Sequence, residues 1–170
     1  MKGLWRHMAI LLVAFPCFGQ QLRNVQFTSI NQQLSQHTVT AIVQDKYGFL
    51  WIGTTSGLNK YDGWNMVTYE HQEDGRAGLQ SGHISTIYED SEGLLWIGTF
   101  GGGLHQYDAP NDVFISYQHD EQDIGSLSDN SVSAIFEDHL QNLWIGTTNG
   151  GLNMLAKGSE KIYSLHTKQG

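Results

Sequence analysis

Apolar and polar residues alternate in a pattern that occurs three times along the chain. Each copy opens with a short alternating segment, "TVTAIVQD", "HISTIYED" or "SVSAIFED", at residues 38–45, 83–90 and 131–138. In the first copy Val39, Ala41 and Val43 fall on one side and Ile42 falls on the other. Because successive side chains of a strand point to opposite faces, both faces are partly apolar, which is typical of a strand buried between two layers.

The pentapeptide LWIGT follows each alternating segment, at residues 50–54, 95–99 and 143–147. It predicts a second strand, with Trp and Gly on one face and the other three residues on the opposite face. A buried Trp removes about 150–250 Å² from water, so we expect Trp51, Trp96 and Trp144 in the core. The glycine leaves room for close approach by another backbone or a bulky ring.

Turn-forming residues separate these two strands. Residues 45–48 and 90–93 begin with an Asp, which can bond the backbone two residues on, and end with a Gly, which accepts a positive φ. Such turns connect antiparallel strands through a short hairpin. The third copy has Gln141 at the glycine position, and we expect Asn142 to take the left-handed conformation instead.

Two more strands complete each unit. Glycines precede a third strand at residues 58–62, 104–108 and 152–156, and an outer strand follows around residues 66–71, 113–119 and 161–166. The tryptophans Trp51, Trp96 and Trp144 are 45 and then 48 residues apart, a spacing close to the period of four-stranded propeller blades. The pattern therefore predicts an all-β fold of three antiparallel propeller blades, at residues 34–78, 79–126 and 127–170.

The three units resemble the two-component regulator propeller repeat. The likeness rests on "VTAIVQDKYGFLWIGTTSGLNKYDG", "ISTIYEDSEGLLWIGTFGGGLHQYD" and "VSAIFEDHLQNLWIGTTNGGLNML". The resemblance implies paired seven-bladed propellers in the periplasm, at the N-terminus of bacterial membrane sensors. In that family a sandwich domain, a transmembrane helix and an output follow, often a histidine kinase and sometimes a nucleotide cyclase. Its ligands are often glycans or their breakdown products.

The first 33 residues are predicted to form two different segments. Residues 1–19 read as a secretory signal peptide, with Lys2, Arg6 and His7 before a short apolar core and small residues before the cleavage point. Cleavage there would place the chain in the periplasm and remove Cys17, its one cysteine. Residues 20–33 are predicted to supply an outer strand, since propellers often close with a strand from one terminus.

Three blades are fewer than the four to eight that closed propellers use. We therefore interpret the chain as an N-terminal fragment of a longer protein, without the output domain. Further propeller blades or another subunit are the expected protein partners, and the membrane is expected to be reached only through segments downstream. The alternative is a partial propeller that self-associates.

Charge and composition narrow the possible chemistry. Twenty glycines and 15% charged residues fit a turn-rich β protein, and a net charge of −8 without Lys or Arg runs disfavours nucleic acid as a partner. No cofactor site is expected, because the glycine clusters lack the Lys and Ser/Thr of a phosphate loop. No metal site is expected either, because the histidines are not paired at ligand spacing and the acidic turns lack a calcium-loop pattern. The eight histidines are His7, His37, His71, His83, His105, His119, His139 and His166.

No catalytic residue is predicted, and we expect no enzyme activity. The carboxylate pairs Glu89-Asp90 and Glu137-Asp138 would point to opposite faces of their strands, and no Gly-x-Ser-x-Gly motif occurs. Exposed aromatic rings could stack on sugars, although we expect most of them in the inter-blade core. The candidates are Tyr61, Trp64, Tyr69, Tyr107 and Tyr117, of which only Trp64 has no counterpart in the other units.

The predicted function is a periplasmic, ligand-sensing propeller region of a two-component signalling protein, with a glycan or another small extracellular molecule as ligand. Two alternatives remain open. One is a carbohydrate-binding module in which several copies complete a ring. The other is an enzyme like the streptogramin lyases, which would need a His and an acidic residue converging at the ring centre.

Overall fold

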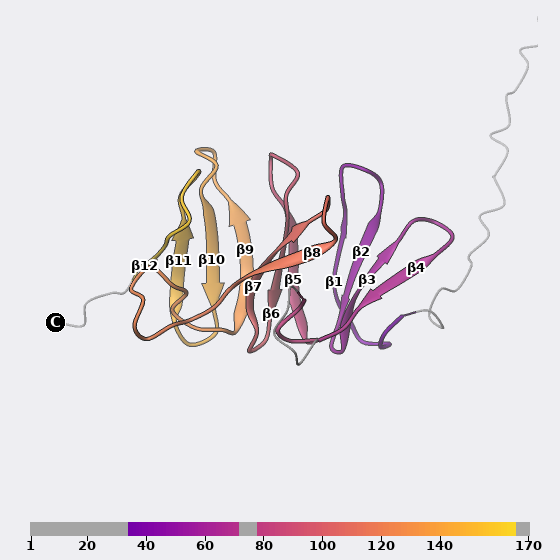
Figure 1. The fold of residues 1–170 in the computed structure, drawn as a ribbon, viewed down its shortest axis with the longest axis horizontal. Helices are drawn as coiled ribbons and strands as arrows, with labels where there is room; N and C mark the ends of the chain where they lie inside the picture. The colour runs from indigo at the N-terminus through magenta and orange to yellow at the C-terminus, as the bar shows by residue number, and fades with distance from the viewer. Residues whose placement is uncertain (1–33, 72–77, 166–170) are drawn as a thin grey trace, which may run out of the picture.

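The computed structural model describes residues 34–71 and 78–165. Within these residues the fold is all-β, as predicted: twelve strands form three four-stranded antiparallel sheets. Figure 1 shows the three sheets side by side, in the order of the chain. The predicted signal segment, the predicted outer strand at residues 20–33 and His166 lie outside the described residues.

Each sheet consists of four strands that are consecutive in sequence, and we call the sheets blades 1, 2 and 3. Blade 1 contains β1 (Val39–Gln44), β2 (Leu50–Thr54), β3 (Gly57–Tyr61) and β4 (Met66–Tyr69). Blade 2 contains β5 (Ile84–Glu89), β6 (Leu95–Thr99), β7 (Gly103–Asp108) and β8 (Val113–Tyr117). Blade 3 contains β9 (Val132–Glu137), β10 (Leu143–Thr147), β11 (Gly151–Leu155) and β12 (Ile162–Leu165).

A β-bulge in the first strand of each blade corrects the prediction of which residues share a face. In β1 the register shifts between Val39 and Ala41, so that Val39 pairs with Thr54 while Ile42 pairs with Ile52. Val39 therefore lies on the face of Ile42, not with Ala41 and Val43 as simple alternation predicted. The extra residue of a bulge reverses the facing of everything before it. Register shifts at the equivalent places in blades 2 and 3 give the same result.

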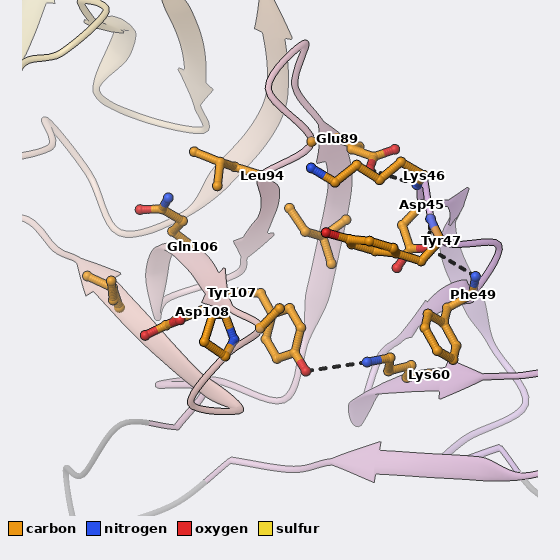
Figure 2. Close-up of a pocket in the computed structure, with 15 residues that line it drawn as sticks. Asp45, Lys46, Tyr47, Phe49, Lys60, Glu89, Leu94, Gln106, Tyr107 and Asp108 are labelled. Carbon is orange, nitrogen blue, oxygen red and sulfur yellow. Dashed lines mark hydrogen bonds between the residues drawn. The ribbon is translucent and has the colours of Figure 1, made fainter.

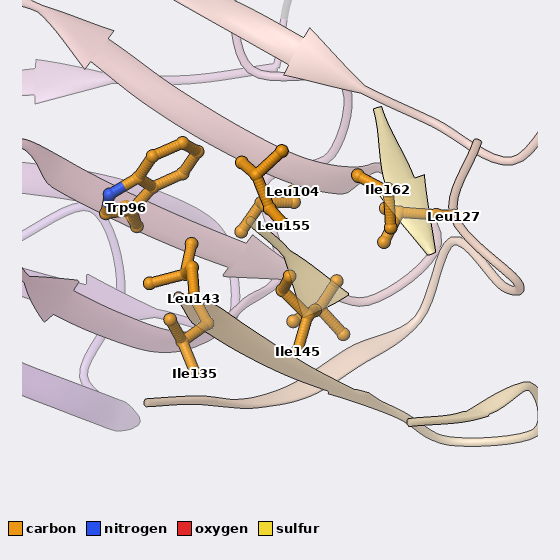
Figure 3. Packing of buried hydrophobic residues seen from close by; sticks show 9 residues of the cluster. Trp96, Leu104, Leu127, Ile135, Leu143, Ile145, Leu155 and Ile162 are labelled. Atoms are coloured by element: carbon orange, nitrogen blue, oxygen red, sulfur yellow. The ribbon is translucent and has the colours of Figure 1, made fainter. Parts of the chain in front are cut away.

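The hydrophobic core lies between the blades. One cluster joins Trp51 and Leu58 of blade 1 to Ile84, Ile97 and other residues of blade 2. A second cluster joins Trp96 and Leu104 of blade 2 to blade 3 (Figure 3). Its blade 3 side, with the preceding linker, consists of Leu127, Val132, Ile135, Leu143, Ile145, Leu155 and Ile162. The tryptophan-bearing faces of blades 1 and 2 thus pack on the blade that follows each in sequence.

The third tryptophan departs from the prediction. Trp51 and Trp96 are buried as expected, but Trp144 is only partly buried. Its face of blade 3 has no following sheet among the described residues. A tryptophan of this repeat is therefore a core residue only when another blade covers it.

The acidic turns contribute more than turn geometry. In each blade one carboxylate oxygen accepts backbone N–H groups of the turn, and the other accepts the indole N–H of the next strand. The Asp45–Trp51, Asp90–Trp96 and Asp138–Trp144 bonds are all 2.8 Å long. These bonds lower the pKa of Asp138, with the Trp144 donor as the largest cause. One side chain therefore fixes both the hairpin and the orientation of the tryptophan.

The third turn corrects another prediction. Gln141 itself takes the left-handed conformation, with φ of 65°, in place of Asn142. The Asn142 side chain instead donates to Asp138 Oδ2 at 3.1 Å, and its backbone N–H donates to Asp138 Oδ1 at 2.9 Å. The carboxylate fixes the position of the turn, so the left-handed residue stays at the place that glycine occupies in the other copies.

The LWIGT glycines leave space for a side chain of the next blade. A Cβ added at Gly53 would lie 2.6 Å from Ile84 Cγ2, and one added at Gly98 would lie 2.7 Å from Val132 Cγ1. Both distances are far inside van der Waals contact. At Gly146 the nearest atoms to an added Cβ are 3.5 Å away and belong to blade 3 itself.

We therefore expect Gly53→Ala to lower the free energy of unfolding by about 1–3 kcal/mol, since it overfills the junction between blades 1 and 2. Gly146→Ala is the matched control and should change it by less than about 1 kcal/mol. Urea denaturation followed by tryptophan fluorescence measures both values. Equal losses in the two variants would contradict the role assigned to the glycine gap.

A buried polar residue ties each blade to the linker that enters it. Asn59 and Asn153 accept hydrogen bonds from the backbone of Ser35 and Ser128, both at 3.0 Å. In blade 2 His105 takes this place and accepts from the backbone of Gln80 at 3.0 Å. Its Nδ1 has no hydrogen-bond partner among the described residues. The nearby backbone of Ile97 raises the pKa of the ring. Burial dominates and lowers the pKa of His105 to about 4.

This histidine should make stability depend on pH. The ordinary pKa of a histidine is about 6.5. Between about pH 6.5 and pH 4, His105 is therefore protonated in the unfolded state but neutral in the folded state. Stability is then fully present above pH 6.5 and falls by up to about 3 kcal/mol as the pH drops to 4. His105→Asn, which introduces the residue of the other two blades, should flatten this part of the stability curve. An unchanged slope in urea titrations at several pH values would contradict the assignment.

Candidate functional site

A cleft opens at the junction of blades 1 and 2, with a volume of about 530 Å³ (Figure 2). It combines aromatic, aliphatic, charged and amide side chains from the two sheets. The lining consists of Asp45, Lys46, Tyr47, Phe49, Lys60, Glu89, Gly93, Leu94, Leu95, Gln106, Tyr107, Asp108, Ala109, Pro110 and Ile115. An aromatic cavity with a few convergent polar groups is the usual form of a small-molecule site.

The β1–β2 turn supplies one wall of this cleft. Asp45 holds the turn through its carboxylate, which accepts the backbone N–H groups of Tyr47 and Phe49 at 3.0 and 2.9 Å. The turn is anchored on the opposite blade as well, because Lys46 N–H donates to Glu89 Oε1 at 2.8 Å. The Tyr47 ring, 71% exposed, extends from this turn into the space between the blades (Figure 2). A fixed backbone thus presents an accessible aromatic face.

Lys60 of β3 lies at the back of the cleft among aromatic rings. Its Nζ is 4.4 Å from the centre of the Phe49 ring, 5.0 Å from that of Trp51 and 5.2 Å from that of Tyr107. It also donates to the Tyr107 hydroxyl at 3.4 Å. Cation–π attraction holds an ammonium group in this kind of setting. The lysine therefore places one positive charge at a defined point among three aromatic rings.

A hydrogen-bonded group behind Lys60 supports the cleft. The Tyr69 and Tyr107 hydroxyls both donate to Asp112 Oδ1, at 2.8 and 2.7 Å. These bonds lower the pKa of Asp112, while burial raises the pKa values of both tyrosines. A second hollow of about 380 Å³ lies beside the first and shares Phe49, Lys60 and Tyr107 with it. The Lys60–Tyr107 contact therefore lies between two adjoining hollows.

The equivalent cleft between blades 2 and 3 is smaller, at about 240 Å³. There Lys157 pairs with Glu92 at 3.2 Å and also donates to Gln141. Glu92 stands at the repeat position of Tyr47, so the ring that lines the first cleft is replaced by a carboxylate that pairs with Lys157 across the second. The repeat builds a hollow at each junction, and local sequence decides how open it is.

Of the sequence candidates for ligand contact, the fold brings together Tyr69 and Tyr107, whose ring centres are 6.1 Å apart, but not the other three. Trp64 is 87% exposed but lies outside both hollows at the blade 1–2 junction. Tyr107 lines the cleft, whereas Tyr117 packs against the cluster between blades 2 and 3 and Tyr61 donates to the Gly63 carbonyl. Tyr47, Phe49 and Lys60 were missed. One signal could have found Tyr47: it is an aromatic residue in a turn whose other copies carry Glu92 and Leu140.

Residues 34–71 and 78–165 contain no group of three or more His, Cys, Asp or Glu side chains able to hold a metal ion. The same residues contain no helix that is long and apolar enough to cross a membrane.

Three segments of the chain match a known family of repeats. Residues 33–56, 78–101 and 126–149 match the family described as two component regulator propeller. The chain thus carries three copies of this repeat, in the register of the three blades.

Related proteins connect the repeat with two-component signalling. Histidine kinase P4 of Formosa agariphila is 37% identical over 71 residues, which are 39% of this chain and 5% of that protein. The extracellular domain of a hybrid two-component system from B. thetaiotaomicron is 32% identical, with a TM-score of 0.75 over 84% of this chain and 20% of that one. The extracellular domain of a one-component system from the same bacterium is 31% identical, with a TM-score of 0.63 over 78% and 18%. The chain therefore spans about a fifth of the length of these solved relatives.

The tyrosine–aspartate group behind the cleft gives a testable prediction. Asp112→Ala removes the acceptor of two hydroxyls and leaves a β-carbon at a φ of 54°, so we expect a loss of about 1–2 kcal/mol in the free energy of unfolding. Asp112→Asn keeps an acceptor oxygen and tolerates the same backbone, so it should retain most of the stability. Chemical denaturation at pH 7 measures both variants. If Asp112→Asn lowers the free energy of unfolding as much as Asp112→Ala does, the hydrogen bonds to Asp112 do not account for the loss.

Proposed function

Because three segments of this chain are two-component regulator propeller repeats, we propose that it is part of the ligand-sensing region of a bacterial two-component signalling protein. The two solved relatives named above are extracellular domains, which supports a place outside the cytoplasm. Residues 1–19, interpreted as a secretory signal, would direct the chain to the periplasm.

The observation that carries this proposal is the open aromatic cleft between blades 1 and 2. A sensor needs a site whose occupancy alters the contact between two rigid parts. The cleft meets that need, because Tyr47 and Lys60 come from one blade and Gln106 and Tyr107 from the next. A ligand bound there contacts two neighbouring sheets. Binding that favours one arrangement of the sheets shifts their equilibrium by its difference in affinity.

The lining favours a glycan or a glycan breakdown product as the ligand. The exposed Tyr47 ring offers an apolar face on which a sugar ring can stack. Glu89, Gln106 and Asp108 line the same space and offer acceptors, with a donor amide, for hydroxyl groups. The lining carries two lysines, Lys46 and Lys60, and three carboxylates, Asp45, Glu89 and Asp108, so its charge favours neutral sugars over acidic ones.

In this proposal the chain binds and performs no chemistry itself. The signal passes to an output contributed by other parts of the full protein, as the histidine kinase relative suggests. The described residues would then form one part of that receptor region.

We expect purified protein to bind at least one member of a panel of neutral and acidic oligosaccharides of two to eight units in isothermal titration calorimetry. Tyr47→Ala should weaken that binding by about tenfold or more, which corresponds to about 1.4 kcal/mol. Trp64→Ala is the control, because it removes an equally accessible ring outside the cleft, and it should leave the affinity unchanged. The proposal fails if no saccharide of the panel binds, or if the two variants lose affinity equally.

A further inference from the structure

The second hollow at the junction of blades 1 and 2 continues the cleft beside it. Its volume is about 380 Å³, and its lining consists of Phe49, Lys60, Asp62, Asn65, Val67, Tyr69, Tyr107, Ala109 and Asp112. Phe49, Lys60, Tyr107 and Ala109 also line the cleft. Both volumes fall within the range of about 300–1,000 Å³ that small-molecule sites occupy. The two spaces are therefore adjoining parts of one groove.

Hairpin turns border the groove along its length. The β1–β2 turn, with Tyr47, lines the cleft, and the β3–β4 turn, with Asp62 and Asn65, lines the second hollow. Because the four strands of blade 1 are consecutive and antiparallel, these two turns lie at the same end of the sheet. The β7–β8 turn of blade 2 contributes Ala109 to both spaces. The groove therefore runs from the first strands of the junction towards its outer strands.

The second hollow repeats the chemistry of the cleft. Val67 is 49% exposed and lies opposite Lys60 on the neighbouring strand, so it offers an accessible apolar surface on the same face. Asp112 Oδ1 accepts the hydroxyls of Tyr69 and Tyr107, whereas its Oδ2 accepts no hydrogen bond from the described residues. An apolar surface beside an available acceptor suits a sugar unit, which has a C–H face and a rim of hydroxyl groups. A ligand that presents this chemistry twice in succession matches the whole groove.

Lys60 has hydrogen-bonding capacity at the boundary between the two spaces. Among residues 34–71 and 78–165 its ammonium group makes one hydrogen bond, to the Tyr107 hydroxyl at 3.4 Å (Figure 2). That bond is longer than the usual range of about 2.7–3.2 Å for an N–H donor. An ammonium group carries further N–H donors besides the one used there. Lys60 can therefore donate to an oxygen atom of a ligand that passes from one space to the other.

The charges around the second hollow disfavour acidic ligands. Asp62 and Asp112 line it together with one lysine, Lys60. The backbone N–H of Asn65 is the main cause that lowers the pKa of Asp62, and the Tyr107 hydroxyl is the main cause that lowers the pKa of Asp112. Both carboxyl groups are therefore ionised at neutral pH. Negative charge exceeds positive charge in this hollow, as it does in the cleft.

We propose that the cleft and the second hollow are consecutive subsites for one neutral oligosaccharide, and that Lys60 and Tyr107 contact the linkage between the sugar units that occupy them. This inference rests on the proposed function, because it assigns a minimum length and a charge to the ligand of the same site. A monosaccharide reaches one subsite only, whereas a longer chain fills both. The affinity of the groove therefore depends on the length of the saccharide.

Isothermal titration calorimetry with neutral saccharides of increasing length tests this assignment. The probes are glucose, mannose and xylose, each with its linear oligosaccharides of up to six units. For at least one of these series we expect the affinity to rise by about tenfold or more with length, and then to level off once both subsites are filled. An affinity that is equal at all lengths would overturn the two-subsite arrangement and leave the proposed function standing. If no saccharide binds, both the arrangement and the proposed function fail.

Val67→Arg separates the second subsite from the first. The carboxylates of Asp62 and Asp112 should hold the new guanidinium inside the second hollow, so the gain in affinity with length should disappear. Tyr47→Ala should instead weaken the binding of short and long saccharides alike. Ser116→Arg is the matched control, because it adds the same charge at an exposed position of β8 outside both spaces, and it should keep the gain with length. Circular dichroism checks that the variants stay folded. A gain that survives in Val67→Arg, or one that Ser116→Arg also abolishes, would overturn the proposal.

Discussion

The contact between the tryptophan face of one sheet and the first strand of the next determines the architecture of this protein. A single four-stranded sheet cannot bury both of its faces, so the core exists only between sheets. Ile84 and Val132 enter the gaps over Gly53 and Gly98, while Trp51 and Trp96 cover the space beside them. Stability is then a property of junctions, as in other repeat proteins.

The aspartate of each turn connects local and tertiary structure. Its carboxylate closes the hairpin through backbone N–H groups and fixes the indole of the following strand through its second oxygen. A buried indole N–H needs such a partner. This explains why an acidic residue precedes every LWIGT strand, and why the third turn keeps its geometry although it lacks glycine.

The two clefts show how equivalent junctions of a repeat come to differ. The junctions share the same framework, but Tyr47 and Phe49 stand where the second junction has Glu92 and Leu94. The first junction is consequently wider and more aromatic, while Lys157 and Glu92 bridge the second. Variation at turn positions changes the hollow without changing the sheets, because these side chains project from the edge of the interface.

The sequence by itself determined the strands, their order, the antiparallel pairing and the repeat, because these depend on alternation, turn residues and period. Only the tertiary structure decided which faces are covered. The bulge that moves Val39 to the face of Ile42 depends on pairing between strands, and the cleft around Tyr47 and Lys60 depends on contacts between blades. The left-handed Gln141 is a local effect, because the Asp138 carboxylate fixes its turn. Trp144 shows the limit most directly: its local sequence matches that of Trp51 and Trp96, yet its burial differs, because burial is set by the neighbouring sheet and not by the residue's own strand.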